Sequence, residues 1–385
     1  MTDIYDRLGL KKYINAYDTL TNYGGSRMKE EVLDSYKESA SYFVDMRELQ
    51  DAVGKRIAEL TDNEAAYVTT GASMGITLGI AACMVGNDRY MNSRLPDTEG
   101  MKNEVIIMRS QRNPYDKAIE VSGAKLKEIG NLFATEEFEL EGSINEKTAA
   151  VYFIKASNYS KAALPLEKVI EIAHRHGVPV IVDAAAQLPP KQNLSHFTKM
   201  GADLVAFSGG KAIRGPLNTG FIVGRRDLIE SCKMIGFPNR GIARGGKVSR
   251  EDMVALLMAL EQYISISEED YQGMLRERVD YFIDALKDNE IYSVDVEEIG
   301  PVGQIYPRLE IMVKGDLFSV EELAEAMKKE DPGILIGLPL QKPYKVFYIN
   351  PLVMDDYEKE TVLNRLIEVG KKLSDRKEKQ EYERR

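Results

Sequence analysis

Short apolar runs alternate with segments of helical spacing over the first two thirds of the chain. In the segment 165–176, for example, Leu166, Val169 and Ile170 recur at the interval that places them on one side of a helix. Runs that predict strands lie at residues 65–68, 105–108, 150–154, 178–182, 204–207 and 220–223. The alternation predicts an α/β fold, with a mainly parallel sheet and helices on both faces.

The pattern changes near Ser249. Helical spacing runs through residues 249–263 and 268–288, and short apolar runs follow, with two further helical segments among them. We therefore predict that residues 1–250 hold an N-terminal segment and a large domain, and that residues 251–385 form a smaller α+β domain. The charged tail, residues 375–385, is expected to fray.

Composition narrows the class of protein. The 385 residues carry a net charge of −10, which argues against a general binder of nucleic acids or membrane surfaces. The two cysteines, Cys83 and Cys232, offer no disulfide framework, which fits a reducing compartment. Because the start lacks an apolar signal segment and no run is long enough to cross a bilayer, we expect a cytoplasmic protein.

One lysine occupies a position suited to covalent chemistry. The segment 202–220 reads ADLVAFSGGKAIRGPLNTG, so Lys211 follows a buried strand and two glycines, which allow backbone shapes that a residue with a Cβ would resist. A lysine held beside apolar residues loses solvation, and its neutral amine becomes easier to reach. Such an amine can form a Schiff base with an aldehyde. On its own, however, the pattern is more often an ordinary exposed loop.

A carboxylate lies at the matching place on another predicted strand. The segment 177–190 reads GVPVIVDAAAQLPP, and its apolar run ends on Asp183, which is 28 residues before Lys211. That interval accommodates one helix and one strand, so both side chains can lie at the carboxyl edge of a parallel sheet, where ligands bind. A lysine and a carboxylate there suit pyridoxal 5'-phosphate, whose ring nitrogen the carboxylate keeps protonated. Alone, Asp183 could equally be a helix cap.

A third motif is suited to the cofactor's phosphate. Gly71, Ala72 and Ser73 precede a run of helical character, and the free N–H groups of a first helical turn favour an anion. The alternative is a plain helix cap. The lysine, the carboxylate and the turn, in this order and beside these strands, together favour cofactor binding.

Other polar residues near the predicted sheet edge are weaker candidates. One of the residues after the 105–108 strand is expected to cover the pyridine ring, with Gln111 the first choice and Arg112 the second. Either can instead belong to an ordinary polar loop. The three histidines lack cysteine or clustered carboxylate partners, so we predict no metal site.

Several basic residues are candidates for holding an anionic part of a substrate. Arg244 and Lys247 lie in the glycine-rich segment RGIARGGK, and Arg27 is an alternative for a distal phosphate. Arg112 is a further candidate for binding the substrate. Arg308 opens a strand of the smaller domain, where its planar fork could bind a carboxylate. A solvated linker and a surface arginine are the competing interpretations.

Several segments resemble fold-type-I pyridoxal-phosphate enzymes of the bacterial selenocysteine synthase (SelA-like) group, and within it the D-glucosaminate-6-phosphate ammonia-lyase family. These segments read INAYDTLTNYGG, FVDMRELQ, LPDTEGMKNEVI, RNPYDKAI, PVIVDAAAQLPP and FSGGKAIRGP. They cover most of the predicted large domain, and the last two are the specific ones.

The resemblance implies a role for each motif. It makes Lys211 the residue that carries the cofactor, Asp183 the partner of the ring nitrogen, and Ser208 a helper of the phosphate turn. Gln111 stands where many relatives have a histidine stacked on the ring, which leaves the reaction type open. The family motif begins at Ile14, so we expect no tRNA-binding domain before it, and with the acidic charge this argues against a tRNA substrate.

The activity implied by the resemblance is a lyase. We expect removal of water and ammonia from a 2-amino-3-hydroxy acid, an amino acid or a phosphorylated amino-sugar acid, to give a 2-keto acid. A racemase or aldolase would need the same lysine and carboxylate, and a non-catalytic homologue is the third alternative. By analogy with fold-type-I enzymes we expect a homodimer or a higher homo-oligomer.

Overall fold

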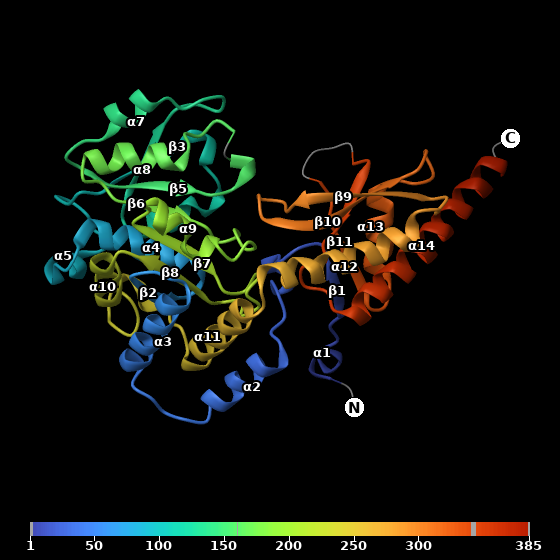
Figure 1. Ribbon diagram of the computed structural model, residues 1–385, viewed down its shortest axis with the longest axis horizontal. Helices are drawn as coiled ribbons and strands as arrows, with labels where there is room; N and C mark the ends of the chain where they lie inside the picture. The colour runs from blue at the N-terminus through green and yellow to red at the C-terminus, as the bar shows by residue number, and fades with distance from the viewer. Residues whose placement is uncertain (1–2, 160, 340–343, 384–385) are drawn as a thin grey trace. The chain divides into compact units, whose positions relative to one another are not determined.

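The chain divides into two compact units (Figure 1). The computed structural model describes residues 3–159, 161–339 and 344–383. The large unit comprises Ser26–Ile266 with Pro301–Gln304, and the small unit comprises Met1–Gly25, Ser267–Gly300 and Ile305–Arg385. The predicted boundary at residue 250 differs from this division in two ways. The residues before Ser26 belong to the small unit, and the large unit continues to Ile266. The packing of each unit explains both differences.

The large unit is built on a seven-stranded sheet in the order β2-β8-β7-β6-β5-β3-β4. Strand β8 runs antiparallel to both of its neighbours, and the other adjacent pairs are parallel. The predicted α/β fold with a mainly parallel sheet is therefore confirmed. The strands are β2 (Ala65–Thr69), β3 (Glu104–Met108), β4 (Lys125–Ile129), β5 (Thr148–Ile154), β6 (Val180–Asp183), β7 (Leu204–Ser208) and β8 (Gly220–Gly224).

Strand β4 was not predicted from the sequence. It reads KLKEI and lies at the edge of the sheet, where only its last residue is fully buried. The inner strands β2 and β5 are buried along their whole length, and these produced clear apolar runs. An edge strand with one solvated side keeps polar residues, so hydrophobic pattern alone does not reveal it.

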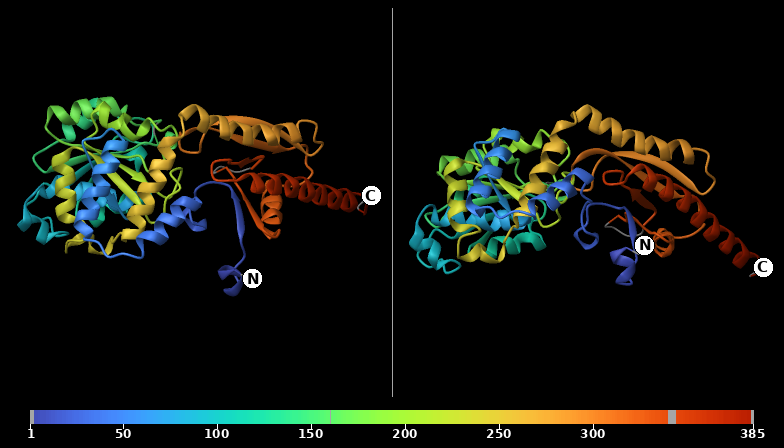
Figure 2. Two further views of the ribbon diagram at one scale, coloured as in Figure 1. Left: turned by 60° about the horizontal axis from the view of Figure 1, so that its bottom comes forward. Right: turned by 90° about the horizontal axis from the view of Figure 1, so that it is seen from below.

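Helices cover both faces of the sheet (Figure 2). Helix α4 (Gly71–Val85) lies against β5, β6, β7 and β8, and is itself covered by α10 (Arg226–Ile235). This double contact explains why α4 is apolar on nearly every side. Its Gly75 and Gly79 lie over Ala206, Ile222 and Leu204, so the helix approaches the sheet closely. Other helices that contact the sheet include α10 itself, α3 (Met46–Leu60), α6 (Lys117–Val121), α7 (Glu137–Ser143), α8 (Leu166–Arg175) and α9 (Asn193–Met200).

Helix α11 explains why the large unit extends past residue 250. It spans Arg250–Ser265, begins at the Ser249 cap, and packs against α3 and α2 (Glu30–Ser39). Arg250 donates hydrogen bonds to the carbonyls of Ser39 and Ala40 at the end of α2, at 3.0 and 2.9 Å. A further helix of the unit is the short α5 (Arg89–Arg94).

The small unit holds an antiparallel sheet of three strands and a parallel pair. The sheet has the order β12 (Val346–Ile349), β10 (Ile305–Val313), β9 (Tyr292–Ile299), and the pair joins β1 (Tyr13–Ala16) to β11 (Gly333–Ile336). Because β1 pairs with β11, the N-terminal residues belong to this unit and not to the large one. The helices of the unit are α1 (Ile4–Arg7), α12 (Glu268–Leu286), α13 (Val320–Lys329) and α14 (Asp356–Glu383).

The prediction that the tail frays from residue 375 is wrong. Helix α14 continues to Glu383. Leu373 is buried in the core of the small unit, and the Arg376 guanidinium lies 2.8 Å from the Glu322 carboxylate on α13. The ion pair of Arg376 lies within the segment 375–385, which the charged composition had predicted to be solvated.

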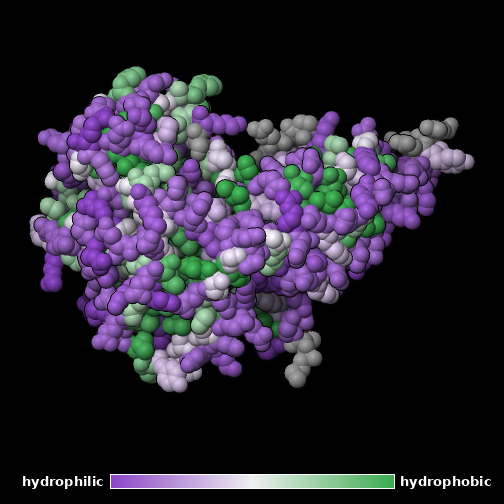
Figure 3. Space-filling model, in the orientation of Figure 1, coloured by the Kyte–Doolittle hydropathy of each residue, from purple (hydrophilic) through white to green (hydrophobic). Residues whose placement is uncertain are grey.

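Hydrophilic residues occupy most of the face shown in Figure 3, with hydrophobic residues in separate groups. Among the described residues, no helix combines the length and apolar character needed to cross a membrane.

We predict that Gly220→Ala destabilises the large unit. A Cβ at this position would lie 2.5 Å from the carbonyl carbon of Gly71, 2.6 Å from the Phe207 carbonyl oxygen and 2.7 Å from the Ala72 nitrogen. All three are backbone atoms, which cannot move aside as a flexible side chain can, so we expect a loss of about 1–3 kcal/mol in the free energy of unfolding. Urea denaturation provides the measurement.

The matched control is Gly142→Ala on α7, where an added Cβ meets no atom within 4 Å. Alanine favours a helix over glycine, so this variant should be as stable as the parent or slightly more so. Equal stability of the Gly220→Ala variant and the parent would contradict the close contact.

Candidate active site

Several strand ends meet at one edge of the large sheet. Residue pairing places Asp183 on β6 opposite Ala206 on β7, and Gly220 on β8 opposite both Ser208 and Thr69. The residues that follow β2, β6 and β7 therefore emerge together. This arrangement brings the phosphate turn, the carboxylate and the lysine segment to the predicted carboxyl edge.

Asp183 is a buried carboxylate with two hydrogen-bond donors. Its side chain is 7% exposed; Oδ1 accepts the Ala185 N–H at 2.9 Å and Oδ2 accepts the Tyr152 hydroxyl at 3.0 Å. Burial raises the pKa of Asp183, and the Ala185 N–H, the positive charge of Lys211 and the Tyr152 hydroxyl act in the opposite direction. The positive charge of Lys211 is near enough to act on this carboxyl.

Tyr152 was missed by the sequence analysis. It lies on β5 beside β6 and is 1% exposed. Burial raises the pKa of its hydroxyl well above the usual value, so the group remains a donor to Asp183. A hydroxyl inside the apolar run VYFI, two residues before the strand end, was the available signal. Without the strand order, its partner could not be identified.

The Lys211 segment is held by backbone contacts on several sides. The Gly209 N–H donates to the Thr219 carbonyl at 2.8 Å, and the Arg214 N–H donates to the Lys211 carbonyl at 2.9 Å. Ser26 donates both its N–H and its hydroxyl to the Gly210 carbonyl, at 3.1 and 3.0 Å. Lys211 itself is half-buried. The fixed backbone on both sides of Lys211 limits where its amine can reach.

The glycines before Lys211 serve close approach and not unusual backbone torsion. Neither has a positive φ. A Cβ on Gly209 would lie 2.3 Å from Thr219 Oγ1, and one on Gly210 would lie 2.7 Å from the Leu217 Cα. The sequence analysis attributed these glycines to backbone freedom, and the structure corrects that reason.

The first turn of α4 is open to an anion. The helix has no side-chain cap and no acidic residue in its first turn, and Gly71 begins it with a φ of +69°. Ser73 is exposed there. Because these N–H groups have no capping side chain, the turn formed by Gly71, Ala72 and Ser73 is suited to a phosphate.

The basic segment with Arg244 and Lys247 lies beside this turn. The Thr70 hydroxyl donates to the Lys247 carbonyl at 3.0 Å, and a Cβ on Gly246 would lie 2.8 Å from the Met74 side chain. Arg244 is exposed and its guanidinium lies 5.7 Å from the centre of the Phe237 ring. Positive charge from this segment therefore adjoins the turn that suits an anion.

Gln111 has a different position from the one predicted. It is fully buried, and its amide donates to the Ile154 carbonyl and accepts the Ile154 N–H, both at 3.1 Å. These bonds connect the residues after β3 to the end of β5. Because both polar groups of the amide are hydrogen-bonded to the backbone, the side chain connects two strands. This geometry gives no support to the prediction that Gln111 covers the pyridine ring.

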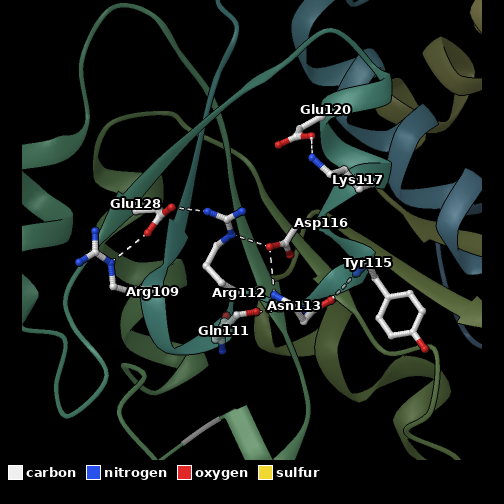
Figure 4. Close-up of polar contacts among 9 residues, drawn as sticks. All are labelled: Arg109, Gln111, Arg112, Asn113, Tyr115, Asp116, Lys117, Glu120 and Glu128. Carbon is white, nitrogen blue, oxygen red and sulfur yellow. Dashed lines mark hydrogen bonds and ion pairs between the residues drawn. The ribbon is translucent and has the colours of Figure 1, made fainter.

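Arg112 is neutralised by two carboxylates. Its Nε lies 2.5 Å from Asp116 Oδ2 and its Nη1 contacts Glu128, which also accepts from Arg109 at 2.9 Å. Figure 4 shows the Arg112 side chain reaching between Glu128 and Asp116. A substrate carboxylate would have to displace these partners, so we do not propose Arg112 as a substrate-binding residue.

The other predicted arginines are placed as follows. Arg27 is exposed in the large unit, and its carbonyl accepts from the Arg214 side chain at 2.9 Å. Arg308, in the small unit, pairs with Glu297 and lies 4.1 Å from the centre of the Tyr348 ring. Its Nε is buried without a partner among the described residues, so one donor remains for a ligand.

Two of the three histidines have carboxylate partners, and His196 lies against the Phe197 ring. His174 Nε2 lies 2.8 Å from Asp203 Oδ2, and His176 contacts Glu141. Within residues 3–159, 161–339 and 344–383, no group of three or more histidine, cysteine or acidic side chains could hold a metal ion.

The residues at this edge fit pyridoxal phosphate. Asp183 would face the ring nitrogen with an oxygen already ordered by Tyr152 or Ala185, Lys211 would carry the aldehyde carbon, and the uncapped turn would bind the phosphate. The glycine at position 220 is part of this fit, because a Cβ there would collide with the turn itself.

Comparison with known proteins agrees with this geometry. The family model Aminotransferase class-V matches residues 95–243. The chain is 37% identical over 266 residues to D-glucosaminate-6-phosphate ammonia lyase of Salmonella typhimurium (strain 14028s / SGSC 2262), covering 68% of this chain and 70% of the relative. It is 32% identical over 282 residues to 5'-C-glycyluridine monooxygenase-decarboxylase of a Streptomyces species, covering 71% and 69%.

A solved structure extends the similarity to nearly the whole chain. The crystal structure described as D-glucosaminate-6-phosphate ammonia-lyase matches with a TM-score of 0.85 and 30% identity, covering 97% of this chain and 100% of that one. The family resemblance predicted from the motifs is confirmed, and with it the fold class and the pyridoxal-phosphate cofactor.

The pKa shift of Asp183 predicts a pH-dependent effect of Asp183→Asn. Because the pKa is raised in the folded protein, the folded form keeps this proton to a higher pH than the unfolded chain, where an aspartate titrates near about 3.9. The stabilisation is complete below that pH and is lost as the pH rises through the folded-state value. In cofactor-free protein, the variant should have a higher Tm than the parent at pH 8, and the two should converge near pH 4. A lower Tm for the variant at every pH would contradict this.

Tyr152→Phe tests the support of the carboxylate. The variant removes the hydrogen bond to Asp183 Oδ2, which is worth about 1 kcal/mol, so we expect the affinity for pyridoxal phosphate to fall about fivefold. Titration of the cofactor into cofactor-free protein, followed by absorbance, measures this. Tyr67→Phe is the matched control, because it removes another buried hydroxyl of the sheet, bonded to the Phe237 carbonyl. Equal affinities of all three proteins would exclude the role of Tyr152.

Proposed function

The chain belongs to the family of D-glucosaminate-6-phosphate ammonia lyase within the fold-type-I pyridoxal-phosphate enzymes, and we propose that it releases ammonia from a 2-amino-3-hydroxy acid that carries a distal anionic group. The observation that supports this best is the similarity to that lyase over 97% of the chain, together with the placement of Asp183 and Lys211 at the ends of the neighbouring strands β6 and β7. D-glucosaminate 6-phosphate is the first substrate to test.

The residues of the site suit this reaction. Bound pyridoxal phosphate supplies a ring that stabilises negative charge at the carbon bearing the amine. Asp183 would hold the proton on the ring nitrogen through its buried carboxylate. Lys211 would carry the cofactor, and its free amine would take the proton from the substrate's Cα. The 3-hydroxyl leaves as water, water returns as ammonia is released, and the net products are a 2-keto-3-deoxy acid and ammonia.

We assign the distal anion of the substrate to the basic segment beside α4. Lys247 and Arg244 are exposed, and the backbone of this segment is held against Thr70 and Met74. Arg27 is a further candidate from the residues that hold the Lys211 segment. A phosphate group is compatible with these cations.

Lys211 and Asp183 would also serve a racemase or an aldolase. The relative with 32% identity is named for a different activity, that of a monooxygenase-decarboxylase. The alternatives differ in their products and in their need for oxygen. The net charge of −10 continues to argue against a tRNA substrate. A homodimer or higher homo-oligomer in the cytoplasm remains part of the proposal.

We predict that the loaded enzyme forms ammonia and a 2-keto acid in equal amounts under argon. The test uses a panel of 2-amino-3-hydroxy acids with and without a terminal phosphate, including D-glucosaminate 6-phosphate. Ammonia is measured enzymatically and the keto acid by its hydrazone. Racemisation without ammonia, cleavage to an aldehyde, or turnover only in the presence of oxygen would each replace the lyase with the corresponding alternative.

Lys211→Ala is the matching variant. Loss of a positioned acid–base group lowers turnover by about 10²–10⁴-fold, and loss of the covalent attachment should also remove the absorbance of the lysine-bound cofactor. The Asp183–Tyr152 hydrogen bond does not involve Lys211, so the fold should persist by circular dichroism. Unchanged turnover would remove Lys211 from the mechanism.

A further inference from the structure

The large unit contains a cavity of about 690 Å³ beside β2, an edge strand of its sheet. It is lined by side chains from the start of α3, from β2, from α5, from the end of α10 and from the segment 237–240. None of the described residues that line it belongs to the Lys211, Asp183 or phosphate-turn segments. A role in the proposed reaction therefore does not account for it.

The cavity has an excess of positive charge. Arg47, Arg89, Lys233 and Arg240 line it, against two carboxylates, which gives 4 − 2 = +2. Both carboxylates, those of Asp51 and Glu230, are paired with Lys233, at 2.8 and 3.0 Å.

The carboxylates of the cavity do not neutralise the three arginines, so the positive charge of these arginines can be balanced by a ligand. Arg47 makes one contact, 3.5 Å from Asn239 Oδ1. Neither Arg89 nor Arg240 has an ion pair or hydrogen bond among the described residues. Guanidinium groups without carboxylate partners, gathered in one cavity of a chain whose net charge is −10, indicate a site for an anion.

A buried amide oxygen adds a second requirement. Gln50 is 3% exposed, and its Nε2 donates to the Val68 carbonyl at 2.7 Å, which fixes the orientation of the amide. Its Oε1 is buried without a partner in the part of the chain that the structure describes, and so is Asn92 Oδ1 on α5. Both residues line the cavity. Buried acceptors of this kind normally have a donor, and hydroxyl or amine groups of a ligand would satisfy them in addition to its charge.

We propose that this cavity binds a small phosphate monoester of a polyhydroxy compound. Two negative charges match the excess of two positive charges, the planar arginine forks suit phosphate oxygens, and the hydroxyl groups satisfy the amide oxygens of Gln50 and Asn92. The volume of about 690 Å³ lies in the usual range for small-molecule sites. The proposal stands whether or not the chain is an ammonia lyase.

D-sorbitol 6-phosphate is a suitable probe, because it has neither the amine nor the carboxylate with which a substrate would engage the cofactor site. It is titrated into the loaded enzyme by isothermal calorimetry, beside sorbitol and inorganic phosphate. We expect one molecule of probe bound per chain, with both reference compounds at least tenfold weaker. Arg89→Ala and Arg240→Ala should each weaken binding of the probe at least tenfold, or about 1.4 kcal/mol.

Three further variants distinguish binding in this cavity from binding at the cofactor site or at the general surface. Arg94→Ala lies on the same short helix as Arg89 but outside the cavity, and should bind the probe like the parent. Lys247→Ala tests the segment beside the phosphate turn and should also leave probe affinity unchanged. Gln50→Met should weaken sorbitol 6-phosphate but not inorganic phosphate.

Three results would overturn the proposal. The first is absence of probe binding to the parent. The second is a loss of affinity in Lys247→Ala but not in Arg89→Ala or Arg240→Ala, which would place the probe at the cofactor site. The third is equal affinity for sorbitol 6-phosphate and inorganic phosphate, which would show an adventitious ion only. The cofactor absorbance and circular dichroism spectrum of each variant verify that it is folded.

Discussion

The burial of one carboxylate is the constraint on which the site depends. Asp183 ends an inner strand where water is excluded, and an isolated charge there would be costly. The structure compensates with a backbone N–H, a tyrosine hydroxyl from the neighbouring strand and a lysine charge. The lysine among these groups is also one that the cofactor chemistry needs. The same contacts thus limit the cost of burial and orient the carboxylate.

Close backbone contact is the second constraint. The antiparallel strand β8 brings Gly220 against the first turn of α4, and Gly209 and Gly210 allow the Lys211 segment to lie against residues 217–219. The α4 turn has no side-chain cap. The phosphate turn and the Lys211 segment are thus both placed by close backbone contacts with the segment 217–220.

The basic residues of the large unit differ in whether a nearby carboxylate neutralises their charge. Arg112 is balanced by Asp116 and Glu128, and such an arrangement mainly stabilises the loop after β3. Arg89 and Arg240, by contrast, face a cavity in which the carboxylates already have a lysine partner. Residue type alone does not separate these two situations, because the partners come from distant parts of the chain.

The sequence by itself determined the alternation of strands and helices, the class of fold, and the three motifs of the site. These features are local: an apolar run predicts a buried strand, and the residues directly after it predict which groups the end of that strand presents. The partners were decided by tertiary structure alone. Tyr152 and Asp183 are 31 residues apart, Gln111 and Ile154 are 43 apart, and β1 pairs with a strand more than 300 residues away. Hydrogen bonding between such residues depends on strand order, and strand order is set by the packing of the whole sheet, which no local pattern records.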